Sequence, residues 1–278
     1  MEKQVYKFTN EIEQIKISAL SAKLVVTAHD EDFILAEYDN PKENPKFCAV
    51  LQDKKLIFKE EASFFGLFNK PAEEYTISVF LPRKAFDKIE ISTASGGADI
   101  KDAQANVFEL ATASGDIVAS GTFADIKMKS ASGNVTFTNN SEIPAKSLKI
   151  STASGNVDAD APAENYSLTC ISGKTTYRNA CGVGNISITS GSVDVNYTEW
   201  NGALSVNVVS GKANITVPDD SAAELSFNGA SGVLKTDIGG EKGNLMNIGR
   251  GTSGTLGSGN VQKVDIRLTS GTVCVARA

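Results

Sequence analysis

The chain has 278 residues, of which 41% are hydrophobic and 22% are charged, so it can bury a core and is not a disordered protein. Its net charge is −6, and the absence of a basic block argues against nucleic acid or an anionic membrane as the main partner. No apolar run approaches the roughly 20 residues that span a bilayer, so we predict no membrane insertion. Residues 1–10 are polar and lack the pattern of a signal peptide, which favours the cytoplasm.

Runs of alternating apolar and polar residues begin near the N-terminus and indicate half-buried β-strands. One run covers residues 15–26 and a second covers 47–58, and both share the register of a repeat found further along the chain. A third inward row ends at Pro82 and consists of Tyr75, Ile77, Val79 and Leu81. We therefore predict that residues 1–88 form degenerate N-terminal coils and a cap.

The segment 60–74 interrupts these runs with four large apolar side chains, Phe64, Phe65, Leu67 and Phe68. Such side chains must be buried against something. One interpretation is that the segment folds back as a cap over the strands. The other is that it protrudes as a hydrophobic contact for a partner protein or a second copy of the chain, which makes the four residues candidate interaction residues.

A repeat occupies residues 89–278. Ser-Gly recurs ten times at steps of 17 to 22 residues, from Ser95-Gly96 to Ser270-Gly271. In most copies apolar or small residues lie two, four and six positions before the serine, and in several copies apolar residues lie three and five positions after it. This change of phase predicts a corner between two strands, and glycine suits a corner because it accepts a positive φ.

These units predict an all-β fold, a single-stranded parallel β-helix or β-solenoid. Each unit is a strand, a corner, a strand and a return loop, and no unit can bury its apolar face unless it stacks on the next. We expect about a dozen coils of 17–22 residues in one domain over residues 1–278, and a right-handed winding because parallel crossovers prefer that hand.

Three features near the C-terminus depart from the repeat. Trp200 lies in a return loop, where it either covers the loop or, if exposed, anchors a partner. The glycine-dense stretch 238–260 is either a flexible insertion or a binding loop. The chain ends in a strand, 272–278, without an obvious cap, so we expect an open last coil that can pair with another chain.

The repeated sequence [Ile/Leu]-x-[Ile/Leu]-x-Thr-Ala-Ser-Gly-[Asp/Asn]-[Ile/Val] resembles that of the bacterial putative-adhesin family, β-strand-repeat domains of unknown function. The best copies are residues 91–100, 110–118, 128–135 and 150–157. The resemblance covers residues 75–278 well and the first 74 weakly. It implies a single-chain parallel β-helix, carries over no catalytic residue, and offers the cell surface as an alternative to the cytoplasm.

The sequence does not group residues as catalysis or metal binding requires. The corner serines have no partner base, because His29 is the only histidine and lies outside the best repeats, so we expect them to bond backbone groups at buried corners. The four cysteines form no CxxC or Cys/His cluster. A strip of acids at similar coil positions is interrupted by asparagines and comprises Asp99, Asp116, Asp158, Asp160 and Asp194.

We therefore predict a non-enzymatic structural or interaction protein that needs no cofactor and no metal. Its partner would be another protein or a second copy of itself. The alternative is a carbohydrate-binding or polysaccharide-cleaving β-helix protein, which rests on analogy of fold alone.

Overall fold

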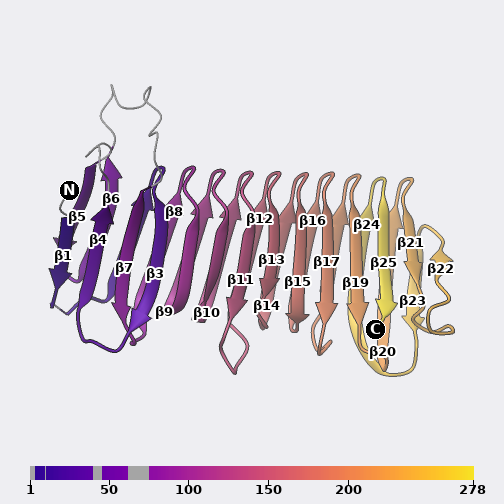
Figure 1. Cartoon of the computed structure of the whole chain (residues 1–278). Coiled ribbons are helices and arrows are strands. Elements are labelled where there is room, and N and C mark those ends of the chain that lie inside the picture. The colour runs from indigo at the N-terminus through magenta and orange to yellow at the C-terminus, as the bar shows by residue number, and fades with distance from the viewer. Residues whose placement is uncertain (1–3, 10, 40–45, 62–74) are drawn as a thin grey trace. The chain divides into compact units, whose positions relative to one another are not determined.

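The computed structural model describes residues 4–9, 11–39, 46–61 and 75–278 (Figure 1). All its regular elements are β-strands, and the described residues form no helix, so none of them spans a membrane as a helix. The chain divides into two compact units, residues 1–141 and 142–278. The predicted single domain over residues 1–278, with degenerate coils and a cap at 1–88 and regular repeats at 89–278, stays a prediction.

The first unit contains two series of hydrogen-bonded strands. One runs β1–β4–β7–β3–β9–β10–β11 and the other β5–β6–β2–β8–β9–β10, because β9 and β10 are long enough to belong to both. The bounds are β1 (Gln4–Phe8), β2 (Gln14–Ala19), β3 (Lys23–His29), β4 (Ile34–Asp39), β5 (Lys46–Gln52), β6 (Lys55–Glu61), β7 (Thr76–Pro82), β8 (Phe86–Thr93), β9 (Ala98–Thr112), β10 (Ile117–Ser130) and β11 (Val135–Asn139).

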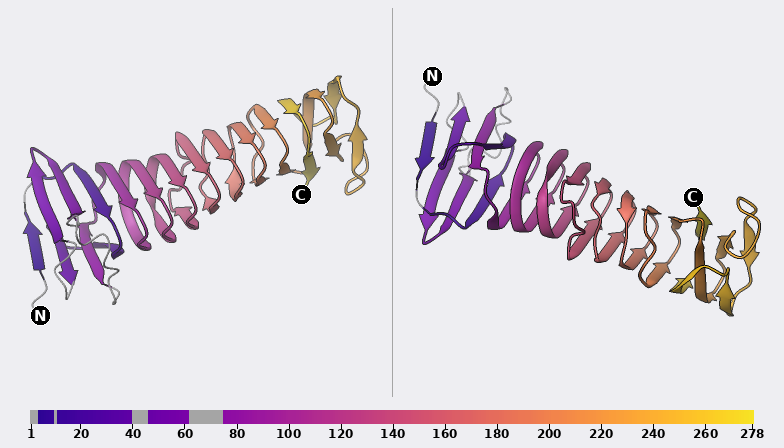
Figure 2. Two further views of the ribbon diagram at one scale, coloured as in Figure 1. Left: turned by 90° about the horizontal axis from the view of Figure 1, so that it is seen from above. Right: turned by 90° about the horizontal axis from the view of Figure 1, so that it is seen from below.

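The second unit contains two parallel series, β12–β14–β16–β18–β24–β20 and β13–β15–β17–β19–β25–β21 (Figures 1 and 2). The bounds are β12 (Ser147–Thr152), β13 (Asn156–Asp160), β14 (Asn165–Cys170), β15 (Lys174–Ala180), β16 (Val183–Ile188), β17 (Ser192–Tyr197), β18 (Leu204–Val208), β19 (Lys212–Val217), β20 (Ser221–Gly229), β21 (Val233–Thr236), β22 (Met246–Ile248), β23 (Thr252–Leu256), β24 (Asn260–Leu268) and β25 (Thr272–Arg277).

The alternating pattern places the core as the sequence predicts. The predicted inward residues Ile15, Ile17, Ala19, Leu24 and Val26 are buried, and so is the row Tyr75, Ile77, Val79 and Leu81. Because strands pair in register, inward side chains stack on their neighbours. Phe108 and Phe123 stack at 4.2 Å between ring centroids in the first unit, and Tyr166 meets Tyr177 at 4.9 Å in the second. Core stabilisation therefore comes from rows of like side chains along the stack.

The prediction of a simple parallel β-helix is wrong, because the strands form a mixed parallel and antiparallel sheet. In the first unit β1, β4 and β7 pair antiparallel, and residues 47–58 form the antiparallel hairpin β5–β6 with Asp53 in the turn, not a coil. In the second unit β22 and β23 pair antiparallel with β21 and β20. Alternation alone does not distinguish the two directions of pairing, so the sequence pattern was compatible with both.

The order of strands also differs from the predicted order at the C-terminus. The final pair, β24 and β25, lies between β18–β19 and β20–β21. The predicted open last coil is therefore wrong, because β25 is hydrogen-bonded on both sides. The glycine-dense stretch 238–260 supplies the strands β22 and β23, and Ser253-Gly254 lies within β23 and not at a corner. Its roles as a flexible insertion or a binding loop stay predictions.

Steric exclusion, and not a positive φ, explains the corner glycines. A Cβ on Gly115 would lie 1.9 Å from the carbonyl oxygen of Gly96, and one on Gly133 would lie 2.1 Å from that of Gly115. Of the corner glycines only Gly271 has a positive φ, of 109°. The corners stack so closely that the backbone of one corner occupies the space that a side chain on the next would need. Glycine is therefore required here for lack of space, and not for a positive φ as the sequence predicted.

Replacing Gly115 by Ala should therefore destabilise the fold by about 1–3 kcal/mol, the usual cost of overpacking a rigid site. Gly249→Ala is the matched control, since its Cβ would meet only Thr252 Oγ1 at 3.7 Å. Chemical denaturation followed by circular dichroism measures both. Equal stabilities of the two variants would contradict the steric explanation.

Candidate functional site: the corner groove

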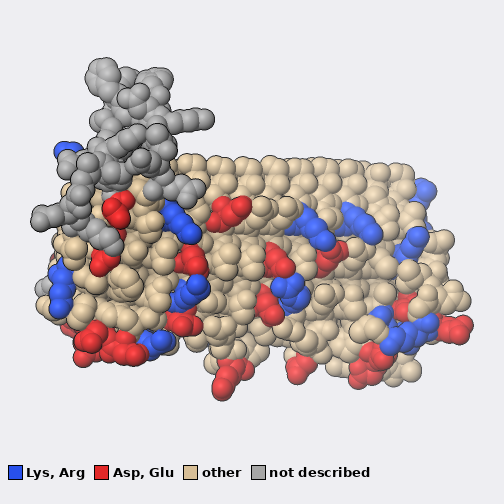
Figure 3. Space-filling view, viewed as in Figure 1, with Lys and Arg blue, Asp and Glu red and all other residues tan. Residues whose placement is uncertain are grey.

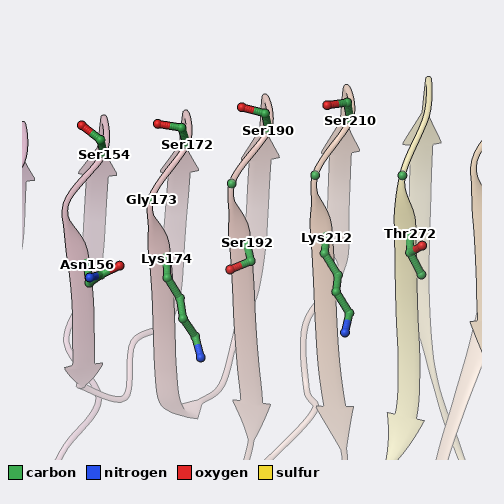
Figure 4. Close-up of a pocket in the computed structure, with 13 residues that line it drawn as sticks. Ser154, Asn156, Ser172, Gly173, Lys174, Ser190, Ser192, Ser210, Lys212 and Thr272 are labelled. Atoms are coloured by element: carbon green, nitrogen blue, oxygen red, sulfur yellow. The ribbon is translucent and has the colours of Figure 1, made fainter.

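A groove of about 610 Å³ runs along the corners of the second unit, and we call it the corner groove (Figure 4). Its lining comes from five neighbouring strand pairs and consists of Ser154, Asn156, Ser172, Gly173, Lys174, Ser190, Gly191, Ser192, Ser210, Gly211, Lys212, Gly271 and Thr272. Figure 4 shows the corner serines at the tops of the loops and a second row of side chains where the next strands begin.

Glycines separate these two rows and keep the groove open. A Cβ on Gly211 would lie 2.2 Å from the carbonyl oxygen of Gly191, and one on Gly173 would lie 2.0 Å from that of Gly155. The stacking that excludes side chains from the corners therefore also leaves a strip of backbone between the serines and the second row. A linear ligand lying along this strip would cross the strands at steps of about 4.8 Å.

The corner serines bond backbone carbonyls, as the sequence predicts, although their side chains are exposed and not buried. Ser172 Oγ donates to Ala153 O at 3.0 Å, and Ser190 Oγ donates to Ile171 O at 3.2 Å. The backbone N–H groups of both serines donate to the same carbonyls. Each hydroxyl uses its proton in this bond, and its oxygen can still accept a hydrogen bond from a ligand.

Lys174 and Lys212 give the groove a positive charge. Lys174 pairs in register with Ser192, and Ser192 pairs with Lys212, so the two lysines are two strands apart. Lys174 Nζ lies 3.0 Å from Asp194 Oδ2, whereas Lys212 forms no ion pair with any residue that the structure describes. No carboxylate lines the groove. In Figure 3 basic side chains lie below the uncharged edge formed by the corners.

The charge of Lys212 acts on one nearby thiol, that of Cys274. Burial raises the pKa of Cys274, and Lys212 opposes this by favouring the thiolate. Cys274 therefore stays protonated near neutral pH and leaves the positive charge of Lys212 without a neighbouring thiolate to neutralise it.

Of the interaction residues predicted from sequence, the structure describes only Trp200, which does not line the corner groove. Phe64, Phe65, Leu67 and Phe68 fall outside the described residues, so their proposed contact role stays a prediction. Trp200 is only 5% exposed and packs on Tyr197 at 6.1 Å between ring centroids, so it covers its loop and does not offer a surface anchor.

The predicted acidic strip is divided among local partners. Asp158 pairs with Arg178 at 2.7 Å, and Asp116 accepts from the side chain of Asn134 at 3.0 Å. Within the described ranges no three His, Cys, Asp or Glu residues gather in a way that could hold a metal ion.

Sequence reasoning missed the two groove lysines. The available signal was their position, since each directly follows a Ser-Gly pair, at 172–174 and 210–212. The spacing predicts a corner at these positions, but only the register of the strands brings both lysines to one row.

Comparison with known proteins identifies the family. Residues 12–276 match the family described as Toastrack DUF4097. No curated protein matches the chain. Among solved structures, a "putative lipid binding protein" from Parabacteroides distasonis ATCC 8503 is 16% identical over 98% of this chain and 96% of its own, with a TM-score of 0.53.

Two further structures are described as putative adhesins. One, from Bacteroides fragilis NCTC 9343, is 12% identical over 99% of this chain and 97% of its own, with a TM-score of 0.49. The other, from Parabacteroides distasonis ATCC 8503, is 14% identical over 99% and 97%, with a TM-score of 0.44. The family match spans nearly the whole chain and confirms the resemblance carried by the Thr-Ala-Ser-Gly repeats: the protein belongs to the Toastrack DUF4097 family.

Proposed function

We propose that this protein is a non-catalytic, adhesin-like scaffold that binds an extended acidic segment of a partner protein in the corner groove. The observation that carries the proposal is the lining of the groove. Two lysines two strands apart, rows of hydroxyls and a floor of glycine backbone lie together, with no carboxylate among them. A cationic, linear and open site suits an extended anionic chain.

The state of the serines supports a binding role over a catalytic one. A serine nucleophile needs a base that accepts its proton. Ser172 and Ser190 donate their protons to backbone carbonyls of the neighbouring corner, which are not bases of that kind. Because these protons are engaged, the hydroxyl oxygens of the two serines are suited to accept hydrogen bonds from a ligand.

The alternative, a carbohydrate ligand, has less support. Ligand pockets for sugars and other small molecules gain much of their affinity from apolar and aromatic walls, and glycosidic cleavage needs paired carboxylates. Neither an aromatic ring nor a carboxylate is among the residues that line the groove. An extended peptide can instead be held by charge and by backbone and hydroxyl hydrogen bonds.

The cell surface is the compartment that fits this proposal. Several structural relatives are described as adhesins, a name that concerns those proteins and reaches this chain only through the family. The cytoplasm, expected from the polar first residues, is the competing prediction. Surface labelling of intact cells of the host distinguishes the two.

The groove is tested with a fluorescein-labelled oligoglutamate peptide and fluorescence anisotropy at low salt. We expect Lys174→Glu with Lys212→Glu to weaken binding at least tenfold, because both attractive charges become repulsive. The control, Lys146→Glu with Lys149→Glu, makes the same change in net charge at exposed sites in and before β12, outside the groove, and should leave binding within about twofold.

Three results would count against the proposal. The parent protein could fail to bind the peptide, or both double variants could lose binding equally, which would indicate an effect of net charge alone. A uronic-acid oligosaccharide that binds more tightly than the peptide and is displaced by the groove variant would favour the carbohydrate alternative.

A further inference from the structure

Strand β25 has a lysine beside it on each of its two neighbouring strands. Lys212 of β19 pairs in register with Thr272, and Lys235 of β21 pairs in register with Cys274. Thr272 and Cys274 point outward, because the residues that alternate with them along β25 are buried. The two lysines therefore flank the same outward stretch of β25, at the end of the corner groove where Thr272 lies.

The surroundings of Lys212 differ from those of Lys174 in one side chain. On β17, Asp194 lies two residues after the register partner of Lys174, and its Oδ2 lies 3.0 Å from Lys174 Nζ. On β25, Cys274 lies two residues after the register partner of Lys212, so it has the same relative position. A thiol therefore stands beside Lys212 where a carboxylate stands beside Lys174.

Asp194 limits what Lys174 can offer to an anionic ligand. Its Oδ1 accepts from the side chain of Asn214 at 2.5 Å, while its Oδ2 contacts Lys174. Lys174 keeps further Nζ protons for a ligand, but a carboxylate that binds there is repelled by the charge of Asp194. We therefore expect Lys174 to contribute less to anion binding than Lys212.

No such acid is paired with the lysines beside β25. Among the described residues neither Lys212 nor Lys235 forms an ion pair. Asp237 is the acid of this region, but it is only 1% exposed and is engaged elsewhere. Its carboxylate accepts from the N–H of Gly243 at 2.8 Å and from that of Arg277 at 2.9 Å. The two lysines thus keep their charge for a ligand.

The charges of both lysines converge at one place on β25. Burial is the main influence on the pKa of Cys274 and raises it, whereas Lys212 and Lys235 each favour the thiolate. Asp237 adds to the rise from its buried position. An anion that lies over Cys274 would therefore be attracted by two lysines from opposite sides of the strand.

We propose that Lys212 and Lys235, with the hydroxyl of Thr272 between their strands, form the subsite that anchors a carboxylate of the ligand over β25. Strands two apart are separated by about 9–10 Å, a distance that two lysine side chains can span with one carboxylate between them. Figure 4 shows Lys212 beside Thr272 in the groove. The inference rests on the proposed function, because it places one acidic side chain of the bound segment at a defined end of the corner groove.

The first test gives Lys212 the internal carboxylate that Lys174 already has. Cys274→Asp should weaken binding of the labelled oligoglutamate peptide by about fivefold or more, because the new carboxylate competes with that of the peptide. Cys274→Ser removes the thiol without adding a charge and should stay within about twofold of the parent. Asn207→Asp adds the same charge at an exposed position of β18, outside the groove, and should also stay within about twofold.

The converse variant releases Lys174 from its internal partner. Asp194→Asn keeps an oxygen that can accept from Asn214 but removes the negative charge beside the lysine. Binding of the same peptide should become tighter, by about twofold or more, because Lys174 then resembles Lys212. Circular dichroism confirms that each variant is folded before its affinity is compared.

The second test needs no peptide and uses the half-exposed thiol of Cys274 as a probe. Anionic iodoacetate and neutral iodoacetamide both react with the thiolate, so the ratio of their rates reports the charge around the thiol and not its pKa. Mass spectrometry measures this ratio at Cys274. Lys212→Gln with Lys235→Gln should lower it by about threefold or more, whereas Lys174→Gln should change it by less than about twofold.

The two tests separate this inference from the proposed function. The inference is overturned if the ratio at Cys274 is the same in the parent and in the Lys212 and Lys235 double variant. It is equally overturned if the Asp and Ser variants of Cys274 bind the peptide alike while the parent binds it. A parent that does not bind the peptide but shows the expected fall in the ratio would reject the proposed function and support the anion subsite.

Discussion

The structure depends on the close approach of most corner glycines to the carbonyl of the corner before them. At Gly96 and Gly115 a Cβ would lie 1.9 Å from that oxygen, so the backbone itself fills the space of a side chain. This contact brings the serine N–H and Oγ–H within reach of one carbonyl and fixes the register of the strands on either side. Pairing the wrong corners would lose both the hydrogen bonds and the rows of buried side chains.

Because the strands pair in register, residues at equivalent positions of successive strands form rows on the surface. In the first unit one row of β2, β8, β9 and β10 brings Lys16 to 2.6 Å from Glu90 and Lys88 to 3.1 Å from Glu109, so its charges neutralise one another. In the second unit the row that follows the corners brings Lys174 and Lys212 together with hydroxyls and without an acid. The same backbone therefore presents a neutralised face in one unit and, in the other, a groove in which Lys174 is paired with Asp194 while Lys212 forms no ion pair with any described residue.

A stack of parallel strands leaves backbone groups unpaired at its ends, and both units cover them in related ways. Antiparallel strands pair near the sheet edges, and a charged side chain bonds the backbone of one corner in each unit, Glu60 at residues 20–22 and Arg250 at residue 230. A carboxylate suits the end that exposes N–H groups, and a guanidinium suits the end that exposes a carbonyl.

The sequence by itself determined the strands, their inward faces and the corners, because alternation and the Ser-Gly spacing are local signals. It identified the rows 15–26 and 75–82 correctly and indicated the family. It did not determine that 47–58 is a hairpin, that β24 and β25 lie between earlier and later strands, or that Trp200 is buried. These depend on which strand edges pair across distant parts of the chain, and alternation is the same for either direction of pairing. The lysine row, Glu60 and Arg250 likewise acquire their roles only when the tertiary structure places them beside a particular corner.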